Sequence, residues 1–157
     1  MSKLIYCITV WGFNLNKEEL RKLQVLQNKI LRLISGMDYD TPVPTLLKVC
    51  NELSVHQLIA YHTVCQVYKI QRTKEPMYHY NRLFGDQSEK QNRTKIRGSE
   101  MSAKQIEFDL SLARGSFFYQ GSRIWNLLPH NIKISKNLRK FKINCKKWIQ
   151  NNISIKP

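Results

Sequence analysis

Apolar residues recur at spacings of three and four along residues 17–35, the pattern of an amphipathic helix. Asn16 stands before this stretch as a potential N-cap, and Glu18 and Glu19 would face the positive end of the helix. Gly36 follows as a stop signal. We therefore expect a helix over 17–35 with a solvated basic outer face. Its apolar side would comprise Leu20, Leu23, Leu26, Gln27, Ile30, Leu31, Leu33 and Ile34.

Two further helices are expected before residue 75. Pro42 and Pro44 interrupt the chain, and the apolar positions of residues 45–50 predict one short helix. Ser54 is a potential N-cap for a longer helix that ends between residues 69 and 73. The wide apolar stripe of this helix predicts burial between neighbours. The stripe comprises Val55, Leu58, Ile59, His62, Cys65 and Tyr68.

The patterning is weaker at two places. Residues 3–12 form a short apolar run rich in β-branched side chains, for which periodicity leaves both a helix and a buried strand open. Residues 74–115 are mostly polar, and we expect 85–105 to form a mobile or extended linker. Residues 77–80 and 106–110 are predicted to pack on the core as short extended pieces.

Regular patterning returns in the last quarter of the chain. Residues 117–128 are dense in aromatic and aliphatic side chains, which predicts a second small core ended by Pro129. Ser135 is the expected cap of a final helix. That helix would carry a heptad-like apolar seam, which consists of Leu138, Phe141, Cys145 and Trp148.

These elements predict a mainly α protein, a small helical bundle with a polar linker and a basic C-terminal module. Residues 1–75 would form a helical domain, 76–115 a polar linker or extended segment, and 116–157 a basic helical module packed on the first domain.

Charge is the strongest signal for function. The 157 residues carry 26 Lys and Arg against 11 acids, a formal net charge of +15. Residues 116–157 contain 9 bases and no acid. Because such self-repulsion destabilises a compact state, a polyanionic partner is a natural inference, and nucleic acid (RNA, DNA or hybrid) is the first candidate.

Basic and aromatic residues alternate in the C-terminal region, which is typical of nucleic-acid-binding surfaces. We expect the cations to contact phosphates and most of the aromatic rings to lie in the core, because the rings fall at helical spacing. Such binding would be weakly sequence-specific. The candidate nucleic-acid-binding residues are Arg114, Arg123, Lys133, Lys136, Arg139, Lys140, Lys142, Lys146 and Lys147.

Catalytic and metal-binding patterns are weak. Asp38 and Asp40 lack the partner acids that a magnesium site gathers from other segments, so we interpret them as turn residues. The pair His62 and Cys65 is interpreted as part of the core, and the four cysteines show no zinc-finger spacing. We expect no metal, no cofactor and no enzymatic activity. No apolar run is long enough to span a membrane, and free thiols suggest an intracellular protein, nuclear or cytoplasmic.

Several stretches, in order, resemble the C-terminal part of reverse transcriptases from non-LTR retrotransposons of the jockey-like and LINE-type groups. Residues 4–12, ending in Trp11-Gly12, are similar to that family's aromatic segment before Trp-Gly. Residues 23–36 resemble its Leu-Gln helix ending in Gly, and residues 46–58 its short helix and the link that follows. Residues 121–129 resemble its Gly-x-x-x-Trp-Asn-x-Leu-Pro motif.

This resemblance implies a helical thumb and post-thumb region that contacts the template–primer duplex, and it implies helix for residues 3–12. The palm with its magnesium-binding aspartates and the endonuclease domain would lie before Met1. The resemblance therefore implies a nucleic-acid-facing role without RNA-directed DNA polymerase activity.

Two alternatives remain open at this point. The seam of Leu138, Phe141, Cys145 and Trp148 would serve a protein-interaction module that docks on a partner or on a second copy. A product with no selected function is the other alternative, which a cooperative melting transition would test.

Overall fold

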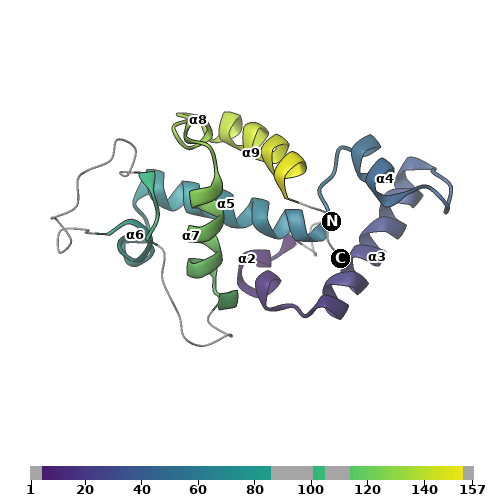
Figure 1. Cartoon of the computed structure of the whole chain (residues 1–157), viewed down its shortest axis with the longest axis horizontal. Coiled ribbons are helices and arrows are strands. Elements are labelled where there is room, and N and C mark those ends of the chain that lie inside the picture. Colours follow the sequence, from purple (N-terminus) through teal and green to yellow (C-terminus); the bar gives the residue numbers. More distant parts are fainter. Residues whose placement is uncertain (1–4, 86–100, 105–113, 154–157) are drawn as a thin grey trace.

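The computed structural model describes residues 5–85, 101–104 and 114–153, in which every regular element is a helix (Figure 1). The predicted mainly α fold is therefore confirmed for these residues. In chain order the elements are α2 (Ile8–Trp11), the 3-10 helix η1 (Gly12–Asn14), α3 (Lys17–Ser35), α4 (Val43–Val49), α5 (Val55–Thr73), α6 (Met77–Phe84), α7 (Phe117–Leu127), α8 (His130–Lys133) and α9 (Leu138–Asn152).

Helix α5 is the centre of the molecule, and α2, α3, α6, α7 and α9 all pack against it. Figure 1 shows α7 crossing in front of α5, with α3 and α4 at the right-hand end of the molecule and α6 at the left-hand end. The buried residues of α5 extend well round its circumference, as its wide apolar stripe predicted. Ser54 caps the helix as expected, because its side chain accepts a hydrogen bond from the Gln57 N–H.

Helix α3 has the predicted bounds and the predicted caps. The Asn16 side chain accepts from the Glu19 N–H at 2.8 Å, and the Glu19 carboxylate accepts from the Asn16 N–H at 2.9 Å. This reciprocal pair is a capping box. Gly36 ends the helix at φ 67°, in the left-handed region where a residue without Cβ is favoured.

The predicted apolar side of α3 is only partly correct. Gln27 and Asn28 are buried, whereas Leu26, Leu33 and Ile34 are exposed by 49%, 85% and 73%. The inward amides are hydrogen-bonded, so their burial costs little. The helix therefore buries two amides beside Leu31 and leaves three of the predicted apolar positions in solvent.

Residues 8–14 of the N-terminal run are helical, as α2 and η1, after a turn at residues 6 and 7. Gly12 joins α2 to η1 and lies directly on α5. A Cβ at this position would come within 2.8 Å of Ile59 Cγ1, so only glycine permits this close approach.

The expectation of an extended piece at residues 77–80 was wrong, because these residues begin α6. Pro76 stands at the N-cap, where its fixed φ suits the start of a helix. Leu83 is fully buried and Phe84 packs against the core. A helix brings both of these adjacent side chains to the core, whereas an extended strand would point them to opposite faces. The second predicted extended piece, 106–110, lies outside the described residues.

Only one part of the predicted linker 85–105 can be described beyond Gly85, and it is tied to α7. The Asn126 amide accepts from the Ala103 N–H and donates to the Ala103 carbonyl, both at 2.9 Å. The Trp125 indole N–H donates to the Met101 carbonyl at 2.7 Å. Residues 101–104 thus pack on the core, which their polar surroundings in sequence did not indicate.

The cap of the last helix is two residues later than predicted. Asn137 accepts from the Arg139 N–H, while the Ser135 carbonyl accepts from the Tyr68 hydroxyl and from Arg72. The loop before α9 is therefore held by α5, and the cap falls where the helix can begin after that contact.

The predicted seam of α9 is buried within the fold. Phe141 and Cys145 are fully buried, Leu138 and Trp148 are partly buried, and Ile149 adds a buried position that we did not predict. The Phe141 ring stacks on Tyr68 with 4.0 Å between centroids. Because α5 occupies the seam, it is no free surface for docking a partner through these side chains.

Candidate nucleic-acid interface

Helix α9 runs antiparallel to α5, and hydrogen bonds from α5 side chains hold the chain at both ends of α9. Near its start the Ser135 carbonyl accepts from Tyr68, and near its end the Ile153 carbonyl accepts from the Gln57 amide at 2.7 Å. Between these points the buried seam fills the contact. The orientation of α9 is therefore fixed, and with it the direction in which each of its cations points.

Helical geometry divides the basic residues of α9 into two groups. At about 100° per residue, Arg139, Lys142 and Lys146 share one flank of the helix. Lys140 and Lys147 lie about 80° to 100° further round than Arg139 by the same count. The predicted cations of α9 are therefore spread over a broad arc of the helix.

The flank of α9 that carries Lys142 lies near two cations of α5, Lys69 and Arg72. Burial lowers the pKa of His62, and the positive charges of Lys142 and Lys69 lower it further. Both lysines are exposed and close enough to act on one imidazole, although they belong to different helices. The exposed Arg72, one turn beyond Lys69, donates to the Ser135 carbonyl at 2.7 Å.

We call this set the α5–α9 cationic surface. Its order along α9 follows from the antiparallel packing, with Arg72 and Arg139 near the start of α9 and Lys146 further along. The set consists of Lys69, Arg72, Arg139, Lys142 and Lys146.

The surface continues into a polar cleft between the end of α4 and the end of α9. Lys146 Nζ donates to the Asn51 carbonyl at 2.6 Å, and the Gln150 amide lies 3.5 Å from Asn51 Oδ1. The cleft measures about 320 Å³, and Lys48 and Glu52 are among the side chains that line it. The amides of Asn51 and Gln150, at the end of the α5–α9 cationic surface, could donate and accept hydrogen bonds beside bound phosphates.

Lys133 does not belong to the interface, which corrects one predicted site residue. It is only 8% exposed, and its ammonium lies 5.8 Å from the centroid of the Trp125 ring and 3.4 Å from the Asn126 carbonyl. Burial lowers the pKa of Lys133. The side chain covers the core instead of reaching solvent.

Arg114, Arg123 and Lys136 are exposed, and of these three Lys136 adjoins the α5–α9 cationic surface because it follows Ser135, which Arg72 contacts. Arg123 faces outwards from α7, opposite the buried side formed by Gly121 and Trp125. Arg114 precedes α7, and Lys136 lies in the segment between α8 and α9. These positions add to the overall positive field.

The aromatic rings are mostly internal, as predicted. Trp125 and Phe141 are fully buried, with ring centroids 6.2 Å apart. Phe118 is partly buried and stacks on His79. Cations therefore dominate what this surface presents to a ligand.

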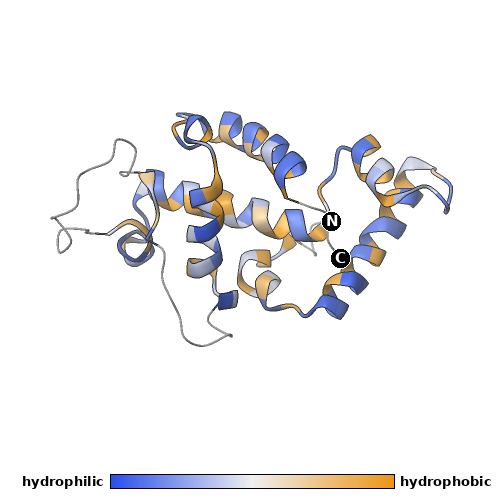
Figure 2. Cartoon of the chain, viewed as in Figure 1, coloured by the Kyte–Doolittle hydropathy of each residue, from blue (hydrophilic) through white to orange (hydrophobic). Residues whose placement is uncertain are grey.

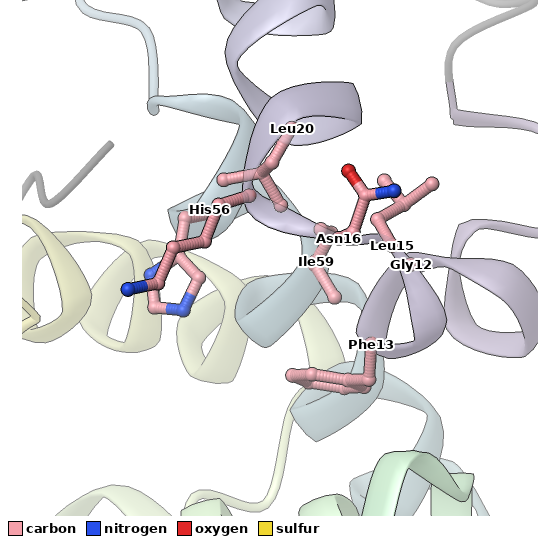
Figure 3. Close-up of a pocket in the computed structure, with 8 residues that line it drawn as sticks. Gly12, Phe13, Leu15, Asn16, Leu20, His56 and Ile59 are labelled. Atoms are coloured by element: carbon pink, nitrogen blue, oxygen red, sulfur yellow. The ribbon is translucent and has the colours of Figure 1, made fainter. Parts of the chain in front are cut away.

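A second hollow of about 270 Å³ lies among η1, the start of α3 and the start of α5. Figure 3 shows Leu20 and Phe13 on opposite sides of Ile59, with His56 at one edge. His56 Nδ1 is buried and has no hydrogen-bond partner among the described residues, and burial lowers the pKa of this histidine. The lining is mainly apolar, so this hollow suits phosphates less well than the α5–α9 cationic surface.

Metal-binding geometry is absent from the part of the chain that the structure describes, where no three His, Cys, Asp or Glu residues come together. Asp38 and Asp40 are exposed around a turn, as interpreted from the sequence. Within the same residues, no helix combines the length and apolar character needed to cross a bilayer.

Lys69 and Arg72 are members of the α5–α9 cationic surface that the sequence analysis did not predict. Lys69 follows His62 by seven residues and so shares its flank of α5, a relation visible from helical spacing. Helical spacing could not show which other helix packs beside that flank of α5. Only the docking of α9 brings Lys142 beside it.

No family model, curated protein or solved structure matches the chain. We therefore infer function from the arrangement of these residues.

Proposed function

We propose that this chain binds nucleic acid through the α5–α9 cationic surface and catalyses no reaction on it. The observation that carries the proposal is the packing of α9 along α5, which leaves Lys69 and Lys142 exposed on two neighbouring helices where both their charges lower the pKa of His62. Cations repel each other, so bringing them together is favourable when an anion lies between them.

The spacing of the cations suits a phosphate backbone. Arg139 and Lys146 are seven residues apart, which is about 10 Å along the helix. A nucleic-acid strand advances about 3.4 Å per phosphate along its axis in a B-form duplex, so this flank spans about three nucleotides. Lysines and arginines that neutralise these phosphates release counterions, which provides the binding free energy.

The contacts proposed here would be mostly to the backbone of the nucleic acid. Phosphates carry no sequence information, so affinity should vary little with sequence. The amides of Asn51 and Gln150 are the groups placed to add hydrogen bonds to a sugar or a base.

We also propose an origin in a non-LTR reverse transcriptase, on the resemblance of residues 23–36 and 121–129 to its motifs. Those stretches form much of α3 and α7, two helices that pack on α5. A thumb-like helical part contacts the template–primer duplex in that family. The proposal therefore favours duplex or hybrid nucleic acid among the possible ligands.

The salt dependence of binding tests the proposal. Labelled RNA, DNA and RNA–DNA hybrid of about 20 residues would be titrated by fluorescence anisotropy between about 50 and 400 mM salt. About four phosphate contacts predict a slope near −3.6 for log affinity against log salt on duplex DNA. The triple variant Lys69→Ala, Lys142→Ala, Lys146→Ala should flatten the slope by about 2 to 3.

A matched control removes the same charge elsewhere. Lys17→Ala, Lys22→Ala, Lys29→Ala changes three exposed lysines of α3. This control should retain the slope and most of the affinity. Absence of binding at low salt would refute the proposal, and equal losses in both triple variants would show that only total charge matters.

A further inference from the structure

Helix α3 presents an apolar seam to solvent. Leu23, Leu26, Ile30 and Leu33 recur at spacings of three, four and three, and Ile34 adjoins them. Leu26, Leu33 and Ile34 are exposed by 49%, 85% and 73%, whereas Ile30 is half-buried and Leu23, at the inner end of the seam, packs partly on the core. Alternation of a hydrophobic position every three and four residues is the pattern by which one helix packs along another.

The fold has fixed the adjoining, inward side of α3 with polar contacts. The buried Gln27 donates to the Leu53 carbonyl at 2.7 Å, and Gln24 accepts from the Val55 N–H at 2.8 Å. Gln24 also donates to Gln27 and to Asn28. These bonds specify which face is inward, because rotating the helix to bury the leucines would leave the amides and backbone groups unpaired.

The outward position of the seam is therefore a consequence of specific contacts and not of loose packing. Figure 2 shows hydrophobic and hydrophilic bands along α3, at the end of the molecule distant from α6. Exposed apolar side chains arranged in one stripe are typical of a docking surface.

We propose that the seam of α3 docks an acidic amphipathic helix of a partner protein. From Leu23 to Ile34 the seam is about 16 Å long, which corresponds to three turns of a helix. A helix laid along it would place its own apolar residues between those of the seam.

Charge determines the kind of helix. Lys22 and Lys29, exposed and seven residues apart, line the outer edge of the seam. Glu19, the acid nearest the seam, is held in the capping box at the start of the helix. A partner helix with Glu or Asp along its flanks is complementary to this edge.

A second copy of the chain fits the seam less well. Each copy has a net charge of +15, so pairing two of them brings like charges together. The acidic helix removes that repulsion. This inference does not depend on the proposed nucleic-acid binding, which rests on residues of α5 and α9.

The test uses the full chain and two synthetic peptides of about three heptads, with Leu at the core positions. One peptide carries Glu at the flanking positions and the other carries Lys. Anisotropy should show saturable binding of the Glu peptide and little binding of the Lys peptide. The double variant Leu33→Asp, Ile34→Asp should lower the affinity for the Glu peptide at least about tenfold. The double variant Lys22→Glu, Lys29→Glu should bind the Lys peptide more tightly than the Glu peptide.

Leu127→Asp is the matched control, because Leu127 is 63% exposed but belongs to α7. Its affinity for the Glu peptide should equal that of the unmodified chain. Circular dichroism of each variant checks that the helices are retained, which the exposure of Leu33 and Ile34 leads us to expect.

Three results would overturn the inference. Equal binding of both peptides would mean nonspecific adhesion of apolar groups. A dimer in sedimentation that the Leu33→Asp, Ile34→Asp variant abolishes would make a second copy the occupant. Loss of nucleic-acid binding in that variant would assign the seam to the nucleic-acid surface.

Discussion

Single positions determine how closely the helices approach α5. Gly12 and Gly121 are both buried against it, with Cβ positions that would fall 2.8 Å from Ile59 and 3.1 Å from Val67. The first distance is below what real Cβ atoms show, and the second is tight. The absence of a side chain at Gly12 is therefore a packing requirement.

Gly12→Ala should destabilise the protein by about 1 to 3 kcal/mol, because the added methyl group overpacks the contact with Ile59. Urea unfolding followed by circular dichroism measures this loss. The effect of Gly12→Ala should be smaller in an Ile59→Ala background, where the clashing atoms are absent. Equal effects in the two backgrounds would contradict the proposed contact.

At the scale of elements, the pairing of α5 with α9 creates an environment that neither helix has alone. His62 is partly buried at their junction, beside Lys69 and Lys142. Burial and the two positive charges lower its pKa, so the imidazole is neutral at pH 7. Because folding lowers the pKa of His62, protonation of this residue favours the unfolded state. The contribution of neutral His62 to the free energy of unfolding is complete above the ordinary pKa of 6.5 and is lost as the pH falls towards the folded value.

Bound nucleic acid should raise the pKa of His62. Phosphates beside Lys69 and Lys142 would offset the positive charges that lower this pKa in the free protein. An NMR titration of the imidazole protons, with and without nucleic acid, measures the change. His56 is the internal control, because burial lowers its pKa and no lysine contributes.

An unchanged pKa of His62 in a saturated complex would place the phosphates elsewhere. Equal changes at His56 and His62 would indicate a general effect of the polyanion and not a local contact.

At the scale of the whole molecule, the N-terminal and C-terminal regions share one core. Ile8 from the start of the chain and Ile149 from its end belong to the same buried cluster. Trp125 and Phe141 join it from α7 and α9. Because α5 is covered from both ends of the sequence, we expect the described regions to unfold as one cooperative unit.

Phe141→Ala should cost about 3 to 5 kcal/mol and destabilise the entire core, since it removes a fully buried ring stacked on Tyr68. Tryptophan fluorescence and far-ultraviolet circular dichroism should report the same transition in the unmodified chain. Ile143→Ala, on the same helix but 50% exposed, should change stability by less than about 0.5 kcal/mol. Two separate transitions would instead support independent N-terminal and C-terminal units.

The sequence by itself determined the helices with strong local signals. α3 and α5 begin and end where their caps and periodicity predicted, because Asn16, Ser54 and Gly36 act on backbone groups within a few residues. The concentration of positive charge near the C-terminus was also visible, since net charge is a sum over residues and needs no fold.

Only the tertiary structure decided which faces are buried and which cations are neighbours. Leu26, Leu33 and Ile34 of α3 face solvent because the hydrogen bonds that join Gln24 to Val55 and Gln27 to Leu53 fix the helix rotation. Lys133 turns onto Trp125, and Lys69 meets Lys142, through packing between segments far apart in the chain. Periodicity describes one helix at a time, whereas a surface is defined by the helices that flank it.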